Sequence, residues 1–217
     1  MSDNKNNVTE LVFILDRSGS MHGLEGDTIG GFNSLIEKQR KAEGRCFVTA
    51  VLFNDKCKTV CDRTELADVF PMTEEDYTVG GCTALLDALG GTIRHIARIH
   101  HYARQEDVPE HTVFVIMTDG LENASRHYTG DQVRRMIEHE KEKYGWEFLF
   151  LAANIDAVEA AESIGIRADR AANYRADSRG TAVVFDVVDE AVSMTRKNKP
   201  IGANWSGRIT DDLNRRK

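Results

Sequence analysis

Hydrophobic positions along the chain follow two different patterns. Continuous apolar runs predict strands that are covered on both faces of a sheet. They occupy residues 11–15 (LVFIL), 46–53, 112–118 and 146–153. Between them, apolar residues recur three and four positions apart, which predicts amphipathic helices. These helices are expected at 26–44, 83–104, 131–145, 156–165 and 178–197.

One strand has a hairpin signal beside it. Asn54 and Asp55 mark a tight turn after strand 46–53, and residues 57–62 follow as its antiparallel partner. Strands that alternate with helices predict an α/β fold: a doubly wound, mostly parallel central sheet with one antiparallel edge strand and helices on both faces. Ligands of such sheets bind beyond the carboxyl ends of the strands, where the strand order reverses.

The length of 217 residues favours one domain. We predict a polar N-terminal arm at 1–7, the domain at 8–197 and a polar C-terminal tail at 198–217. The tail shows no period, so we expect it to be mobile or draped over the surface. Trp205 and Ile209 are the two side chains in it that could dock it to the domain.

Composition and charge exclude several functional classes. Hydrophobic residues make up 41% and charged residues 29%, as in ordinary soluble domains. The net charge of −7 argues against general binding to nucleic acids or anionic membranes, which require a basic face. No apolar run reaches the length of about 20 residues that spans a bilayer. The first ten residues, MSDNKNNVTE, lack a signal-peptide core, so we expect a cytoplasmic location.

The 4 cysteines raise the question of a zinc site. Cys57 and Cys61 are spaced C-x3-C, but the segment between them is predicted to be a strand. Residues four apart in a strand are separated by roughly 13 Å, which is too far for one tetrahedral ion. We therefore expect reduced structural or surface thiols.

Polar residues follow two of the buried strands and begin one helix. Asp16 comes directly after LVFIL, and Asp119 comes directly after TVFVIMT. Ser18 and Ser20 follow Asp16 at alternating positions, which keeps the three side chains on one side of an extended turn. Thr83 lies in the stretch VGGCTALLDAL, at the start of a predicted helix. If the two strands are neighbours at the switch point, all five side chains meet in one crevice.

Two carboxylates and three hydroxyls without His or Cys form a hard, all-oxygen donor set. This chemistry suits Mg²⁺, and also Mn²⁺ or Ca²⁺, rather than zinc. Such a set leaves at least one coordination position open. Each part also has a simpler interpretation, because Asp16, Ser18 and Ser20 can cap a turn and Thr83 can cap a helix.

Three motifs in this order resemble a known family. DRSGS (16–20) matches the D-x-S-x-S motif of von Willebrand factor type A (vWA) domains. GGCTALLDAL (80–89) resembles their threonine loop, and MTDG (117–120) resembles the stretch with their second aspartate. The resemblance covers roughly residues 8–197 and is greatest to stand-alone bacterial domains. It implies a Rossmann-like fold.

The resemblance also implies a metal-ion-dependent adhesion site. By the family pattern, Ser18 and Ser20 bind the metal directly, and Thr83 binds directly or through water. Asp16 and Asp119 act directly or through water, so that no position of the five departs from the pattern. The open position is then filled by an Asp or Glu carboxylate of a partner protein. This implies a non-enzymatic interaction module.

Two other functions remain as alternatives. A Mg²⁺-dependent phosphoryl-transfer enzyme also places aspartates at strand ends. However, Asp16 is followed by R-S-G-S, which lacks a second carboxylate two residues on, and there is no G-x-x-x-x-G-K-[ST] loop. Neither serine has a convincing base beside it. The other alternative is a recruiting subunit of a chelatase-like or tellurite-resistance and stress complex.

Residues after Asp119 extend the hypothesis to the surroundings of the site. Glu122, Asn123, Ser125 and Arg126 are predicted to shape the surface that meets a partner. Asp87, one turn beyond Thr83, is expected to brace a loop rather than to bind metal.

Overall fold

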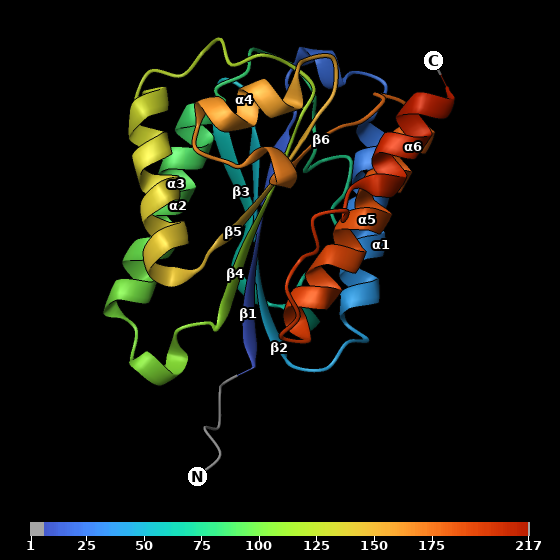
Figure 1. Ribbon diagram of the computed structural model, residues 1–217. Coiled ribbons are helices and arrows are strands. Elements are labelled where there is room, and N and C mark those ends of the chain that lie inside the picture. Colours follow the sequence, from blue (N-terminus) through green and yellow to red (C-terminus); the bar gives the residue numbers. More distant parts are fainter. Residues whose placement is uncertain (1–6, 217) are drawn as a thin grey trace.

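The computed structural model describes residues 7–216 and contains one six-stranded sheet (Figure 1). The strand order is β3-β2-β1-β4-β5-β6, and every neighbouring pair is parallel except β2 and β3. The strands are β1 (Val8–Asp16), β2 (Arg45–Phe53), β3 (Cys57–Glu65), β4 (His111–Thr118), β5 (Glu147–Ala152) and β6 (Ala171–Asn173). The antiparallel edge strand predicted from the hairpin signal is confirmed.

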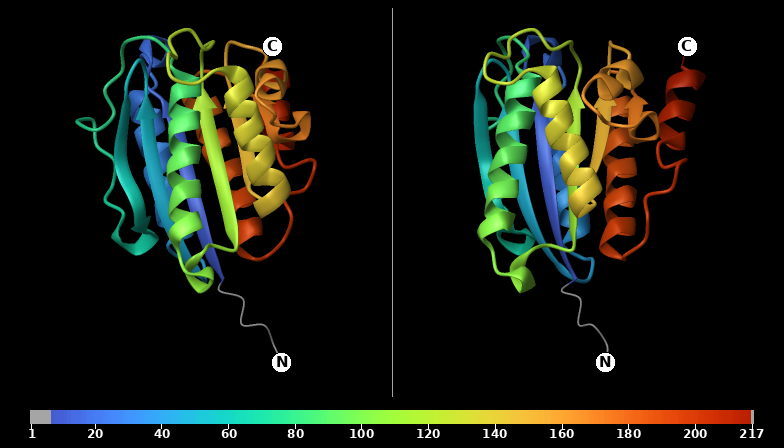
Figure 2. Two further views of the ribbon diagram at one scale, coloured as in Figure 1. Left: turned by 90° about the vertical axis from the view of Figure 1, so that its left-hand side faces the viewer. Right: turned by 60° about the vertical axis from the view of Figure 1, so that its left-hand side comes forward.

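Helices cover both faces of the sheet (Figures 1 and 2). One face carries α1 (Glu25–Gln39), α5 (Ser178–Arg196) and α6 (Gly207–Arg215). The other face carries α2 (Leu85–Tyr102), α3 (Gly130–Tyr144) and α4 (Ala157–Ser163). The predicted doubly wound architecture is confirmed. Within residues 7–216, no helix is both long enough and apolar enough to cross a membrane.

The central strand shows why its sequence is apolar throughout. Leu11, Phe13 and Leu15 of β1 pack against the core under α1 and α5. Val12 and Ile14 point the opposite way, into the core under α2 and α3. Because successive side chains in a strand face opposite sides, a strand between two helical layers has no polar face.

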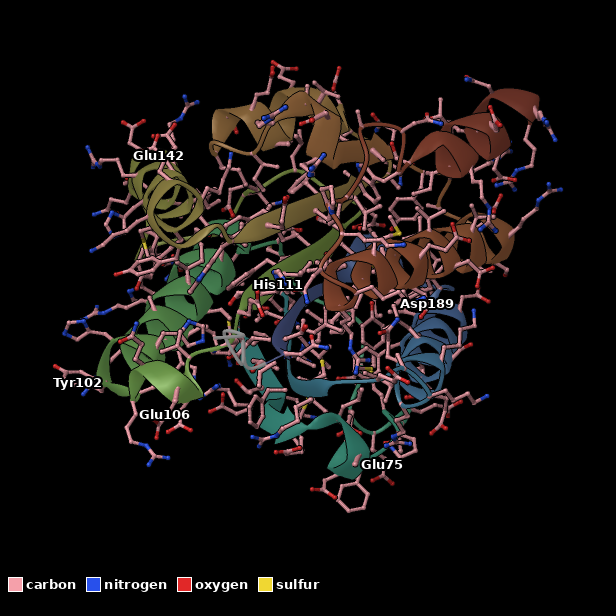
Figure 3. All side chains as sticks on the ribbon, turned by 60° about the horizontal axis from the view of Figure 1, so that its bottom comes forward. Glu75, Tyr102, Glu106, His111, Glu142 and Asp189 are labelled. Atoms are coloured by element: carbon pink, nitrogen blue, oxygen red, sulfur yellow. The ribbon has the colours of Figure 1, made fainter. Side chains whose placement is uncertain are left out.

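The switch point lies between β1 and β4. The chain leaves β1 for β2 and β3 on one side and then returns to β4 on the other side of β1. The carboxyl ends of β1 and β4 therefore meet where the strand order reverses. The amino ends of these strands lie at the opposite end of the molecule, which comes forward in Figure 3. His111, labelled there, is the first residue of β4.

Two helix ends illustrate how local and tertiary signals differ. Helix α3 begins at a capping box formed by Thr129 and Gln132, and its last residue, Tyr144, is followed by the capping residue Gly145 in a left-handed conformation (φ 67°). Both signals are local, and the predicted end at a glycine is confirmed.

The predicted end of the first helix at Gly44 is wrong, because α1 ends at Gln39. The guanidinium of the buried Arg196 donates to the carbonyls of Glu43 (3.2 Å) and Gly44 (2.8 Å). These carbonyls belong to a non-helical turn. The partner that holds this turn therefore comes from the far end of the sequence.

The segment after α5 is more ordered than its composition predicts. The sequence left two outcomes open for the tail at 198–217, and its described part lies on the domain surface: it includes α6, which packs on α5. The absence of a helical period is wrong for α6. Docking by the two proposed side chains is confirmed: Ile209 is 2% exposed, and Trp205 Nε1 donates to the carbonyl of Asp169 (2.8 Å). The predicted N-terminal arm lies outside the described residues except for residue 7, and the domain boundaries stay a prediction.

Candidate functional site

Asp16, the last residue of β1, is held in place on all sides. Its Oδ1 accepts a hydrogen bond from the backbone N–H of Ser18 (2.7 Å), and its Oδ2 accepts one from Thr118 Oγ1 (2.6 Å). The hydroxyl of Tyr77 donates to its backbone carbonyl. The carboxylate is almost fully buried and has one fixed orientation.

The three hydroxyls lie beside the two carboxylates. Ser18 Oγ and Ser20 Oγ are 3.2 Å apart, and Ser20 Oγ donates to Asp119 Oδ1. A Cβ atom placed on Gly120 would lie 3.4 Å from Ser20 Oγ and 3.6 Å from Thr83 Oγ1. The structure therefore brings all five predicted residues to one place at the carboxyl end of the sheet.

Asp119 has a free oxygen. Its Oδ1 accepts the bond from Ser20, but its Oδ2 is buried and has no hydrogen-bond partner within residues 7–216. Burial raises the pKa of Asp119, and the nearby negative charge of Asp16 raises it further. Burial also raises the pKa of Asp16, although hydrogen bonds from Thr118 and Ser18 oppose the increase. Both effects disfavour the ionised forms in the absence of a cation.

The donor set at this site fits a hard cation. No Lys, Arg or His of the described chain forms an ion pair with Asp16 or Asp119. Over the same residues, no three His, Cys, Asp or Glu side chains are grouped closely enough to hold a metal ion, so hydroxyls would have to complete any site. An all-oxygen set with an orphaned carboxylate oxygen matches the preference of Mg²⁺, Mn²⁺ and Ca²⁺.

The cysteines do not offer a competing centre. Cys57 is exposed and Cys61 is half-buried on β3, and both thiols are unpaired. Burial raises the pKa of Cys61 to about 11, which keeps the thiol protonated at neutral pH. A protonated thiol is a poor metal ligand.

The loop that carries Thr83 is braced by the loop that follows β4. Thr83 N–H donates to Asn123 Oδ1 (2.9 Å), and the Thr83 carbonyl accepts from the N–H groups of Asn123 (3.0 Å) and Ala124 (3.2 Å). Glu122 Oε2 accepts from the N–H of Leu86 (2.9 Å) in the first turn of α2. Glu122, which is half-buried, and Asn123, which is exposed, therefore both position this loop through their side chains. Their role in a partner surface stays a prediction.

Asp87 of α2 braces the loop that follows β4, and the prediction that it braces a loop is confirmed. Its carboxylate accepts from the backbone N–H groups of Arg126 (2.9 Å), His127 (2.8 Å) and Tyr128 (2.9 Å). Desolvation opposes ionisation of Asp87, but these three bonds outweigh it and lower its pKa. Ser125, which is half-buried, also takes part, because its Oγ accepts from the Asp87 N–H (3.0 Å). Of the four residues predicted to shape a partner surface, Asn123 and Arg126 are exposed.

Backbone hydrogen bonds join the loop after β1 to the loop that carries Thr83. Gly19 N–H donates to the Gly81 carbonyl (3.1 Å), and Gly80 N–H donates to the Arg17 carbonyl (2.9 Å). Gly81 has a positive φ of 80°, and a Cβ there would overlap the carboxylate of Asp55. Only glycine allows this approach without strain.

Sequence reasoning missed two residues that orient the site. Thr118 is a polar residue at the end of an apolar strand, and this position was a usable signal. Tyr77 had no local signal, because it reaches the Asp16 carbonyl from a loop 61 residues further along the chain. Tyr174 also lies near both aspartates, whose charges, together with its burial, raise the pKa of its hydroxyl.

Comparison with solved structures identifies the fold. Proximal thread matrix protein 1 from the mussel byssus, with a zinc-occupied MIDAS motif, matches with a TM-score of 0.59 and 15% identity over 85% of this chain and 46% of that chain. A von Willebrand factor type A protein from Catenulispora acidiphila matches with a TM-score of 0.54 and 16% identity, over 86% of this chain and 42% of that chain. The ArnB paralog VWA2 from Sulfolobus acidocaldarius matches with a TM-score of 0.53 and 16% identity, over 85% of this chain and 45% of that chain.

These similarities show that the chain has the Rossmann-like fold of vWA domains, as its motifs predicted. The chain spans less than half the length of these solved structures. Comparison of the sequence with protein-family models and with curated proteins gives no match.

Proposed function

We propose that this chain is a protein-binding module that depends on a divalent cation. The hydroxyls of Ser18, Ser20 and Thr83, together with Asp16 and Asp119, would hold the ion, for which we propose Mg²⁺. An Asp or Glu carboxylate of a partner protein would complete its coordination. When bound, the cation supplies a positive centre that attracts this carboxylate.

The observation that carries the proposal is the unpartnered, buried Oδ2 of Asp119 beside Asp16 and the hydroxyls. Burying an ionised carboxylate without a counter-charge is costly, so natural proteins pair such groups or use them to bind metals. Here the chain supplies no cation of its own among the described residues. An external divalent ion would remove the cost for both carboxylates at once.

The exposure of the five side chains supports binding from outside. Asp16, Ser18, Thr83 and Asp119 are buried, whereas Ser20 is exposed. A partner would therefore approach the ion from the side of Ser20. The hydroxyl ligands add no charge, so the ion would keep its attraction for a further carboxylate.

We propose that the module is not an enzyme. The hydroxyls of Ser18 and Ser20 contact each other, and that of Ser20 donates to Asp119. Neither hydroxyl bonds to a His, the residue that commonly activates a serine nucleophile. A Mg²⁺-dependent phosphotransfer assay tests this point. Turnover that disappears in Asp16→Ala would favour the phosphoryl-transfer alternative instead.

Calorimetry with Mg²⁺, Mn²⁺, Ca²⁺ and Zn²⁺ tests the metal site and its preference. We expect saturable binding that Asp119→Asn abolishes and that the control Asp55→Asn retains, because Asp55 is an exposed carboxylate outside the cluster. Absence of binding, by heat and by melting temperature alike, would contradict the proposal. The mussel structure with its zinc-occupied motif is the reason to include zinc.

A pulldown in Mg²⁺ and in chelator, with wild type and Asp119→Ala, tests partner binding. Partners retained only by the wild type in Mg²⁺ support the module. Assembly into a chelatase-like or stress-resistance complex is the form of this function proposed from the resemblance. The cytoplasmic location stays a prediction.

A further inference from the structure

A groove runs beside the proposed metal site. It has a volume of about 990 Å³ and lies between the turn after β2, the loop with Thr83, helix α2 and the loop after β4. Its lining includes Cys82 and Ala84, the two neighbours of Thr83 in the sequence. One wall of the groove is therefore formed by the same loop that carries Thr83, so the groove lies next to the proposed site although none of the five proposed ligands lines it.

Two adjacent glycines in α2 differ in what they contact. Gly90 is required by packing, because a Cβ there would overlap the ring of Tyr128. Gly91 lies in the same helix, is exposed, and has nothing within 4 Å of the position of a Cβ. Gly91 lines the groove. Glycine weakens a helix interior relative to alanine, and no packing contact at Gly91 explains its presence. It does, however, leave the groove open.

The groove combines apolar surface with exposed cations. Cys57, Cys82, Ala84 and Ala124 line it together with Tyr128. Lys56 and Arg126 also line it, and both are exposed. The lining also holds two carboxylates, those of Asp55 and Asp87. The Asp87 carboxylate is satisfied by three backbone N–H groups and belongs to the wall itself, whereas Asp55 is exposed next to Lys56 in the sequence.

We infer that the partner segment carries an acidic residue with a large apolar side chain close to it in sequence. The acidic carboxylate would reach the metal, and the apolar side chain would enter the groove over Gly91. The exposed Lys56 and Arg126 would attract the acidic segment. The inference rests on the proposed function. The volume of the groove lies within the range of small-ligand sites, which suits a short extended segment of the partner.

Selection from a phage library of random peptides tests the inference without a known partner. The protein is immobilised in Mg²⁺, and bound phage are eluted with chelator. We expect an enriched Asp or Glu with Leu, Ile, Met or Phe at a constant offset. Enrichment of the acidic residue alone would overturn the groove and leave the proposed function intact. Absence of any acidic enrichment would overturn both.

A matched pair of variants locates the apolar subsite. Gly91→Leu fills the groove from a helix position that favours leucine over glycine, so the fold should be retained. Gly30→Leu is the control, because Gly30 is also an exposed helical glycine with open space, and its neighbour Gly31 also packs against a ring, that of Phe185. We expect Gly91→Leu, and not Gly30→Leu, to lose the apolar enrichment while keeping the acidic one. An unchanged enrichment in Gly91→Leu would overturn the inference.

Two further measurements use a selected peptide and its Leu→Ser counterpart. We expect wild type to prefer the apolar peptide about tenfold in Mg²⁺, and Gly91→Leu to bind the two equally. In Mg²⁺, the apolar peptide should slow alkylation of the exposed Cys82. In a control that lacks Mg²⁺, it should not. Equal affinities in wild type, or equal alkylation of Cys82 with and without peptide in Mg²⁺, would contradict the groove as the docking site.

Discussion

Strand β1 carries a buried carboxylate near each end, and the two carboxylates differ in the partners that surround them. Glu10, at 0% exposure, receives two bonds from Arg63 Nε (2.8 and 2.9 Å) and one contact from His100 Nε2 (2.8 Å). Within residues 7–216, Asp16, at 1% exposure, has only hydroxyl and amide donors, and Asp119 beside it has an orphaned oxygen. The carboxylate near the amino end of β1 therefore has a counter-charge, whereas those at the carboxyl end have none among the described residues.

The difference follows from which elements reach each end of the sheet. At the amino end, β3 contributes Arg63 and α2 contributes His100, and both are long enough to reach Glu10. The guanidinium of Arg63 also lies 4.9 Å from the centre of the Phe47 ring. At the carboxyl end, loops contribute short hydroxyls and backbone N–H groups. Burial of a carboxylate is therefore no evidence by itself for a metal site, because the missing counter-charge is the signal.

Removing the counter-charge of Glu10 should have the largest effect. Arg63→Met would leave a buried carboxylate with His100 as its remaining partner, and we expect the free energy of unfolding to fall by roughly 3 kcal/mol. Urea denaturation measures it. The double variant Arg63→Met/Glu10→Gln should recover much of the loss. A single variant as stable as wild type would show that the two ends of β1 do not differ as described.

Supplying the missing cation at the other end should have the next largest effect. At free Mg²⁺ about 100 times its Kd, linkage predicts stabilisation by about 2.7 kcal/mol. Asp119→Asn should lose this gain, and Arg63→Met should keep it, because the two ends are independent. Melting curves in Mg²⁺ and in chelator measure both. Equal stabilisation of wild type and Asp119→Asn would contradict metal binding at this site.

The pH dependence of the metal-free protein should distinguish the two ends further. Burial raises the folded-state pKa of Asp16 and Asp119 above the unfolded value of 3.8, so the native state holds more protons. Stability should then fall as pH rises from 3.8 through the raised pKa values, by up to about 1.4 kcal/mol per pH unit and carboxyl. Urea denaturation as a function of pH measures the slope, which Mg²⁺ and Asp119→Asn should each reduce. Stability that rises with pH over this window would contradict the assignment.

Two tyrosines near the carboxyl ends of β1 and β4 should show the smallest difference in stability on substitution. Tyr77→Phe removes the hydroxyl that donates to the Asp16 carbonyl, and we expect a loss of about 1 kcal/mol. Tyr174→Phe removes a buried hydroxyl without a partner in the described chain, so its stability should be unchanged or slightly higher. Thermal denaturation of the two variants side by side measures the difference, and a larger loss in Tyr174→Phe would reverse the interpretation.

Local patterns predicted much of the architecture. The apolar strands of the sheet and the period of the long helices are visible in the sequence because each residue's environment follows from its position in a regular element. The capping box at Thr129 and the left-handed Gly145 are equally local. Of the missed elements, β6 has only three residues and so lacks a detectable pattern. Helix α6 carries a short signal, because Ile209 and Leu213 lie four residues apart in an otherwise polar segment.

The composition of the site was also visible in the sequence. Asp16, Ser18, Ser20, Thr83 and Asp119 stand out because polar residues interrupt or follow apolar runs, and the structure places them together. Their role as metal ligands stays a prediction. The bracing of the Thr83 loop by Glu122 and Asn123 was not visible in the sequence, because it depends on a contact between two loops. The predicted partner surface stays a prediction.

The sequence by itself determined which strands are buried on both faces, which residues end them and which oxygen donors are available. The tertiary structure alone decided that Arg63 pairs with Glu10, which His100 also contacts, while no Lys, Arg or His of the described chain pairs with Asp119. It also decided that Gly91 faces an open groove whereas Gly90 holds a ring. The physical reason is that hydrophobic periodicity acts between residues close in sequence, whereas charge pairing and open space depend on segments that meet only when the chain folds.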